Sequence, residues 1–170
     1  MANFKQPPIV RHEALAPLSR DHYVGLVQAR HLILAADEDD VARRKAVEEF
    51  IDAWEREIAV HFRDEERLLS ALMDEKDRQR LLDEHARLTE LATKVCAQRR
   101  QIDPDPLTLR EFGQSLEQHI RWEERELFSR IQDRMNPSRL DELQKQTVMI
   151  ETSRPRTLCR TRTDADRSGA

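Results

Sequence analysis

Two short stretches of the sequence each contain a histidine followed four residues later by a glutamate. HFRDEERLL carries His61 and Glu65, and HIRWEEREL carries His119 and Glu123. Residues four apart on a helix share one face, so each pair would present an imidazole beside a carboxylate. Such donors suit first-row transition metals, and carboxylates from two different helices can each bridge a pair of metals.

The chemistry-bearing residues fall on the apolar faces of amphipathic stretches, where polar side chains are normally avoided. His22 and His85 occupy the same kind of position in two further stretches, and no Lys or Arg falls on these faces. A buried carboxylate without a partner is unfavourable by roughly several kcal/mol. We therefore expect a cation in the core, and the candidate metal ligands are His22, His61, Glu65, His85, His119 and Glu123.

The elements that must position these residues are helices. The chain of 170 residues has only 3 glycines, and 36% of it is charged. Ala, Leu, Glu, Arg and Gln are good helix formers, and runs of β-branched and aromatic residues are missing. Apolar spacing predicts long helices over about 14–36, 41–73, 77–100 and 107–135. Short connections favour an all-α, antiparallel up-down-up-down four-helix bundle with a short extra C-terminal helix.

The apolar stripes add detail to this prediction. The stripe of the fourth helix drifts slightly between Leu127 and Ile131. In an antiparallel bundle, the starts of the first and third helices meet the ends of the second and fourth. At about 1.5 Å per residue, all six candidates then lie within roughly two turns of one depth, as a single site would require. The expected inward stripe of the first helix is Leu15, Leu18, His22, Leu26, Ala29, Ile33 and Ala36.

The ends of the chain differ in composition from the helical part. In the short helix Asn136 would be the cap and Pro137 the first residue, and its apolar face could cover the bundle or serve a partner. The tail is rich in Arg, Thr and Ser and is expected to be disordered. The predicted parts are an N-terminal arm over 1–13, the bundle over 14–135, the short helix over 136–150 and the tail over 151–170.

Charge and hydropathy argue against nucleic-acid and membrane partners. The net charge is −4 with both signs interspersed, whereas phosphate contacts need a clustered basic patch. No stretch approaches the roughly 18 apolar residues that span a bilayer, and MANFKQPPIV lacks the pattern of a signal peptide. Cys96 and Cys159 do not form a disulfide framework or a cysteine-based zinc site. A reducing cytoplasm is the expected location.

The ordered motifs resemble hemerythrin-like (HHE cation-binding) proteins over about residues 11–135. RHEALAPLSRDHYVGL looks like the first-helix signature, HFRDEERLL the second, DEHARL the third and HIRWEERELF the fourth. The resemblance implies two non-haem iron ions, oxo- or hydroxo-bridged, with Glu65 and Glu123 as bridging ligands. The four histidines would be terminal ligands, and zinc or manganese could occupy the same site.

Two departures separate this sequence from the oxygen-carrying hemerythrins. Those proteins have a second histidine four residues after the third-helix ligand, where this chain has Thr89 after His85. Their fourth-helix motif ends in Asp five residues after the histidine, whereas here Glu123 follows His119 by four. With one histidine fewer, about two coordination positions stay open, and open positions favour chemistry over reversible oxygen transport.

Several residues near the candidate ligands have other expected roles. Glu66 and Glu124 lie about 100° further round their helices, where they would be solvated or hydrogen-bonded to the ligands. His12 is a weaker candidate ligand, Tyr23 a candidate neighbour of the site, and His31 a surface residue.

The resemblance implies a protein that reacts with peroxide, dioxygen or nitric oxide. Catalase- or reductase-like turnover by a diiron oxidoreductase is one class of function. The alternative is a sensor of oxygen, nitric oxide or iron, or an iron-handling protein, without turnover; its readout would use the last helix and the tail. A third interpretation is a helical protein without metal. Whether the chain is an enzyme and how it oligomerises are left open by the sequence.

Overall fold

The computed structural model describes residues 10–153, and this part of the chain is helical without a strand. The all-α prediction is therefore confirmed. Residues 1–9 and 154–170 lie outside the described part, and with them most of the predicted arm and tail and Cys159. Within the described part, no helix combines the length and apolarity needed to cross a lipid bilayer.

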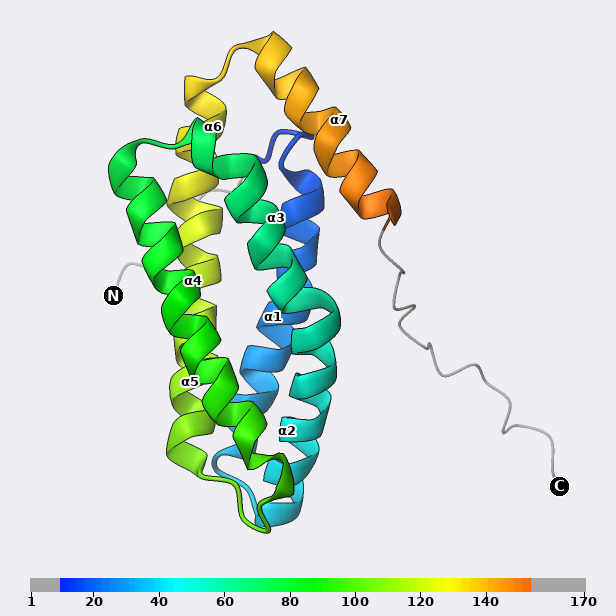
Figure 1. Ribbon diagram of the computed structural model, residues 1–170, viewed down its shortest axis with the longest axis vertical. Helices are drawn as coiled ribbons and strands as arrows, with labels where there is room; N and C mark the ends of the chain where they lie inside the picture. The colour runs from blue at the N-terminus through cyan, green and yellow to red at the C-terminus, as the bar shows by residue number, and fades with distance from the viewer. Residues whose placement is uncertain (1–9, 154–170) are drawn as a thin grey trace, which may run out of the picture.

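Four long helical segments lie side by side along the longest axis of the molecule (Figure 1). The first is α1 (Ala16–Ala35). The second joins α2 (Asp40–Ala53), the π-helical turn η1 (Trp54–Ile58), α3 (Ala59–Leu69) and the 3-10 turn η2 (Ser70–Leu72). The third is α4 (Glu75–Cys96), followed by the 3-10 turn η3 (Ala97–Arg100). The fourth joins α5 (Pro106–Trp122), the π-helical turn η4 (Glu123–Leu127) and α6 (Phe128–Arg134), and α7 (Pro137–Ser153) follows.

Aspartate caps begin the second, third and fourth segments. The side chains of Asp39, Asp74 and Asp105 each accept a hydrogen bond from the backbone N–H three residues further on, at 2.8–2.9 Å. Each cap satisfies one of the backbone donors that a helix start leaves unpaired. The acidic turns between segments therefore define where the helices begin.

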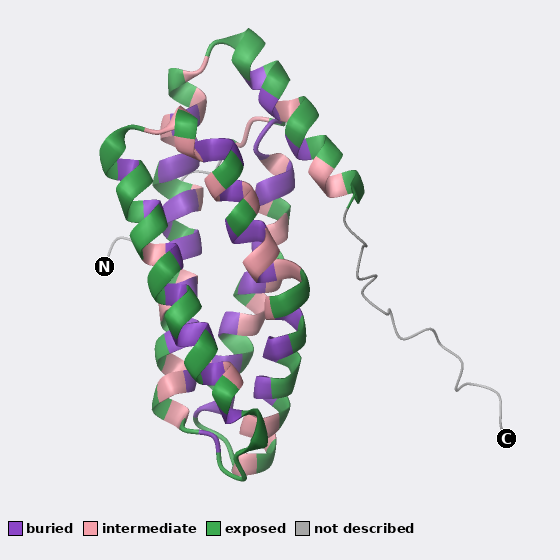
Figure 2. Cartoon of the chain, in the orientation of Figure 1, coloured by how far each residue is buried: buried purple, intermediate pink, exposed green. Residues whose placement is uncertain are grey.

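Two apolar clusters fill the interior, and buried positions face inward along all the long segments (Figure 2). Phe62 of the first cluster stacks on His85 with ring centroids 4.0 Å apart. Phe128 of the second cluster stacks on His22 at 5.5 Å. His85 thus contacts the first cluster and His22 the second, and the clusters shield these histidines from water.

The inward face of α1 differs from the predicted stripe at two positions. Leu26 is 37% exposed and Ile33 is only partly buried, whereas Gly25 and Leu32 are buried. A Cβ added at Gly25 would lie 2.8 Å from Ile120 Cδ1, so α5 approaches α1 at this point. The stripe was predicted from apolar side chains, and Gly25, which faces inward in place of Leu26, has no side chain.

A second glycine makes the same contact from α5. A Cβ at Gly113 would lie 2.7 Å from the backbone oxygen of Ala29 and 2.7 Å from Ile33 Cγ1. Helices that meet through glycine can bring their backbones unusually close. This contact holds α1 against the segment that carries Glu123 and Glu124.

The π-helical turn η4 explains the drift predicted for the fourth helix. Steps of four residues lead from His119 through Glu123 and Leu127 to Ile131. Each such step turns an α-helix about 40° too far, because its period is about 3.6 residues. The wider turn at Glu123–Leu127 absorbs part of this excess, and all four residues remain at most 2% exposed.

The helix predicted after the long segments is present as α7 and extends to Ser153. The Asn136 side chain accepts from Arg139 N at 2.9 Å, as predicted for a cap. Leu140, Leu143 and Thr147 are buried, so this face covers the molecule. The Thr147 hydroxyl donates to the backbone oxygen of Ala14 at 2.9 Å and ties α7 to the residues before α1.

Candidate metal centre

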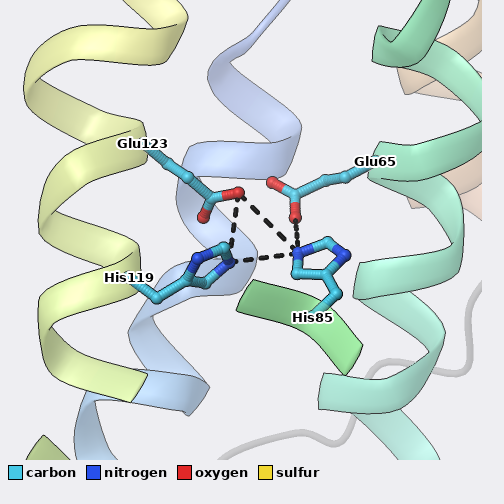
Figure 3. A group of neighbouring side chains, drawn as sticks. All are labelled: Glu65, His85, His119 and Glu123. Carbon is cyan, nitrogen blue, oxygen red and sulfur yellow. Dashed lines mark hydrogen bonds and ion pairs between the residues drawn. The ribbon is translucent and has the colours of Figure 1, made fainter. Parts of the chain in front are cut away.

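The structure brings the six predicted ligands together in one buried cluster. Glu65 and Glu123 are fully buried, and the four histidines are 2–5% exposed. The side chains come from α1, α3, α4, α5 and η4, and four of them converge in Figure 3. Their grouping at one depth is thus as predicted, while their role as metal ligands stays a prediction.

One side of the cluster is formed by His22 and His61. Their Nε2 atoms lie 3.4 and 3.2 Å from the same oxygen, Glu65 Oε1. His22 Nε2 is also 3.1 Å from Glu123 Oε2. Two imidazole nitrogens and one oxygen of each glutamate therefore meet here.

The other side is formed by His85 and His119, whose Nε2 atoms are 3.1 Å apart (Figure 3). The remaining oxygens of the two glutamates face this pair. Glu123 Oε1 lies 3.3 Å from His119 Nε2, and Glu65 Oε2 lies 3.6 Å from His85 Nε2. Each glutamate thus divides its two oxygens between the two histidine pairs.

The inner polar atoms lack partners of the kind that buried groups require. Among the described residues, no hydrogen bond reaches either oxygen of Glu65 or Glu123, or Nε2 of His22 or His61. Leaving several such atoms unpaired in one core would be strongly destabilising. Nitrogen and oxygen donors converging without a partner fit a cation, and these residues form two groups able to hold a metal ion.

An outer ring of carboxylates surrounds the inner cluster. Each of its members is the chain neighbour of an inner residue, yet each approaches a histidine on the next segment. Asp21 of α1 lies 3.5 Å from His61 Nδ1, and Glu66 of α3 lies 2.8 Å from His85 Nδ1. The ring continues around the molecule from α4 to α5.

Two further contacts, from α4 to α5 and from η4 to α1, complete this ring. Glu84 of α4 lies 2.8 Å from His119 Nδ1, and Glu124 of η4 lies 2.6 Å from His22 Nδ1. An ionised carboxylate only accepts hydrogen bonds, so Nδ1 carries the proton in these contacts. The Nε2 atom is then turned inward, which is the arrangement that prepares a histidine to bind a metal.

The carboxylates also control the protonation of the metal-free cluster. Burial by itself would lower the pKa of His119, but Glu123 and Glu84 outweigh it and raise the pKa to about 9. Burial would likewise lower the pKa of His22, yet the nearby carboxylates of Glu123, Glu124 and Glu65 raise it well above the usual value. Without a metal, His22 and His119 therefore hold a proton more tightly than a free histidine does.

Comparison with known families agrees with this donor set. The model of the hemerythrin HHE cation-binding domain matches residues 18–146. The chain belongs to this family. Searches of curated proteins and of solved structures each found no match.

This hemerythrin HHE protein does not place Thr89 in its site. Thr89 is exposed, and its hydroxyl donates to the backbone oxygen of His85 at 2.8 Å. The position where an oxygen carrier has its extra histidine therefore offers no inward ligand here. The site keeps two histidines on each side.

Other candidate residues lie away from the inner cluster. His12 Nδ1 accepts from the backbone N–H of Ala14 at 3.1 Å, so it stabilises a turn. Tyr23 is 71% exposed and is not a neighbour of the site. His31 is a surface residue as predicted, 3.5 Å from Glu49.

Glu84 and Asp21 in the outer ring were not foreseen. The sequence does contain a signal for them, because an acidic residue stands next to an inner residue on each segment: Asp21, Glu66, Glu84 and Glu124. One residue earlier or later along a helix is about 100° round its axis, which is where a neighbouring segment lies. The expectation that Glu66 and Glu124 hydrogen-bond to ligands is confirmed, although their partners belong to other helices.

Proposed function

We propose that this hemerythrin HHE protein binds two iron ions and uses them to react with peroxide, dioxygen or nitric oxide. The observation that carries the proposal is the division of the glutamate oxygens. Glu65 and Glu123 each present one oxygen to the pair His22–His61 and one to the pair His85–His119. Carboxylates so placed would bridge two ions.

The proposal includes the antiparallel up-down-up-down four-helix bundle that is typical of such sites. In support, the four long segments lie side by side, and successive segments run in opposite directions in Figure 1. Side chains from all four reach the inner cluster. Each ion would thus be held by helices distant in sequence.

The donor types favour iron over other metals. Imidazole and carboxylate donors with positions left open are typical of non-haem iron. Each half of the cluster offers two imidazole nitrogens and two carboxylate oxygens, which is fewer than the six donors of an octahedral ion. Cys96, the free thiol among the described residues, does not belong to either group of potential metal ligands.

Bound iron would supply one-electron redox chemistry with small oxidants. The chain's own residues hold the donors in place, exclude water and position protons. Phe62 and Phe128 cover two of the imidazoles. Glu66, Glu84 and Glu124 accept hydrogen bonds from the outer nitrogens and so orient the inner ones.

A cavity beside His119 has room for a small substrate. A pocket of about 120 Å³ between α4 and α5 has His119 and Glu84 in its wall. This volume corresponds to about four water molecules. Peroxide, dioxygen and nitric oxide fit such a space.

Stopped-flow spectroscopy of the iron-loaded, reduced protein tests this function. Mixing with peroxide, dioxygen or nitric oxide should change the iron absorption, and excess peroxide or oxygen should be consumed catalytically. A folded His119→Ala variant should lose the reaction, while His31→Ala, which changes only the exposed histidine, should keep it. Equal rates in both variants would show that the proposed site is not responsible.

The sensor or iron-handling alternative has one structural observation in its favour. α7 is tied through Thr147 to Ala14, just before the start of α1, the helix that carries His22. If iron oxidation occurs once without turnover and alters hydrogen exchange in α7, the alternative replaces the enzyme. The cytoplasmic location and the partners expected from the sequence stay predictions.

A further inference from the structure

Arg11 lies in the residues before α1, and its guanidinium is buried against the candidate metal centre. Its side chain is only 9% exposed. Its Nη2 donates to the backbone oxygen of Glu124 and, at 2.6 Å, to Glu124 Oε2. Among the described residues, its Nε and Nη1 are buried without a partner. Burying a cation with two unpaired donors is unfavourable, which argues for a role at this place.

Two contacts connect Arg11 to His22. The first runs through Glu124, whose other oxygen lies 2.6 Å from His22 Nδ1. The second runs through Phe128: the guanidinium carbon is 4.9 Å from the centre of its ring, and the ring stacks on His22. Arg11 therefore fixes both the hydrogen-bond partner of the imidazole and the ring that covers it.

We propose that Arg11 is a positioning residue that locks His22 in the orientation needed to bind the metal on the His22–His61 side. The inference rests on the proposed metal binding but concerns a different part of the chain. The family match begins at residue 18, so Arg11 precedes it.

The other side of the centre has a similar but looser arrangement, which supplies a matched control. Arg80 donates to Glu84 at 2.6 Å and lies 4.1 Å over the ring of Trp122, and Glu84 contacts His119. However, Arg80 is 45% exposed and pairs with a residue four positions away on the same helix. An exposed pair of this kind contributes little. Arg80→Gln should therefore leave His119 in place.

A second control separates positioning from simple attachment of the chain before α1. Thr147 holds this stretch at Ala14 without contacting Glu124. Thr147→Val loosens the stretch but leaves Arg11 its partners. If Arg11 acted only by tying down the chain, both variants would have the same effect on metal binding.

Zinc binding to the full chain, measured in competition with a chelator, tests the proposal. Arg11→Gln should weaken one of the two zinc positions by about ten-fold and leave the other unchanged, as loss of support around a metal ligand typically does. Arg80→Gln and Thr147→Val should stay within about two-fold of the wild type. Removal of a cation acting by charge alone would instead tighten zinc binding, so the sign distinguishes positioning from electrostatics.

Nuclear magnetic resonance of histidine side chains supplies a readout that does not depend on metal uptake. In wild-type protein the Nδ1 proton of His22 should exchange slowly with water, and in Arg11→Gln this signal should broaden or disappear. Arg11→Lys keeps the charge but replaces the planar guanidinium over Phe128 by a shorter ammonium group, so it should resemble Arg11→Gln and serves if that variant folds poorly. An unchanged His22 signal in both variants would overturn the proposal. Wild-type protein that binds no zinc would overturn the proposed metal binding alone.

Discussion

Each inner histidine lies between two kinds of carboxylate. On the inside, Glu65 and Glu123 approach the Nε2 atoms, and on the outside the ring of Asp21, Glu66, Glu84 and Glu124 approaches the Nδ1 atoms. The outer contacts determine which nitrogen faces inward. The inner contacts place each Nε2 atom beside a carboxylate oxygen, where both would bind a metal in the proposed active form.

Metal loading should release protons. The pKa of His119 is raised to about 9, and that of His22 is also raised, because carboxylates outweigh the effect of burial. His119 is then protonated at pH 7 in the metal-free protein, His22 holds a proton more tightly than a free histidine, and a metal must displace such protons. Adding ferrous iron or zinc to weakly buffered protein should acidify the solution, and affinity should fall as the pH is lowered. His31→Gln should behave like the wild type; absence of acidification in both would contradict the assignment.

At the scale of elements, the centre depends on how closely α1 approaches α5. Gly25 and Gly113 allow this approach, and the π-helical turn η4 keeps Glu123 and Leu127 facing inward together. π-helical turns of this kind often occur at functional sites. A regular helix with ordinary side chains at the contact would present a different face to His22.

Gly113→Ala should destabilise the protein by about 1–3 kcal/mol, as overpacking typically does. The new methyl group would meet the backbone oxygen of Ala29 at 2.7 Å, and a backbone atom cannot move aside easily. Gly25→Ala is the matched control, because its methyl group meets only the movable end of Ile120. Its unfolding free energy should stay within about 1 kcal/mol of the wild type, helped by the better helix propensity of alanine. Equal effects in urea unfolding would contradict the close backbone contact.

Thr147→Val should lower the unfolding free energy by about 1–2 kcal/mol, since it leaves the buried oxygen of Ala14 without its donor. Thr152→Val removes a comparable hydroxyl from an exposed position of the same helix, where the bond is to Met149. That change should stay within about 0.5 kcal/mol of the wild type. A loss of the same size in both variants would mean that α7 is not anchored through Thr147.

The sequence was sufficient to predict the helices and the grouping of the inner residues, because both follow from the apolar period. Two apolar stripes carry a His-x-x-x-Glu pair and two others a single histidine. Once the segments pack through these stripes, the six side chains must lie close together. The apolar period could not predict that Gly25 faces inward or that Arg11 contacts Glu124. Glycine carries no hydropathy signal, and the contact of Arg11 with Glu124 joins residues 113 positions apart. The outer ring had a local signal, but its pairing depends on which segments are neighbours.

The whole molecule is a helical scaffold with two apolar clusters and a polar centre in contact with both. The centre is costly to bury without a cation, since two carboxylates lie together away from water. Binding two metal ions to the folded state alone should stabilise it, because the ligands come from segments that separate on unfolding. The proposed centre therefore requires two metal ions per chain.

The most direct test is the metal content of the protein purified without chelators and loaded with ferrous iron under anaerobic conditions. Elemental analysis should find about two irons per chain in the wild type and in His31→Gln. A folded variant combining Glu65→Gln with Glu123→Gln, which keeps the shapes of both side chains but removes their charges, should bind few or none. An iron content near zero in the wild type, or an unchanged content in the double variant, would contradict the proposed diiron centre.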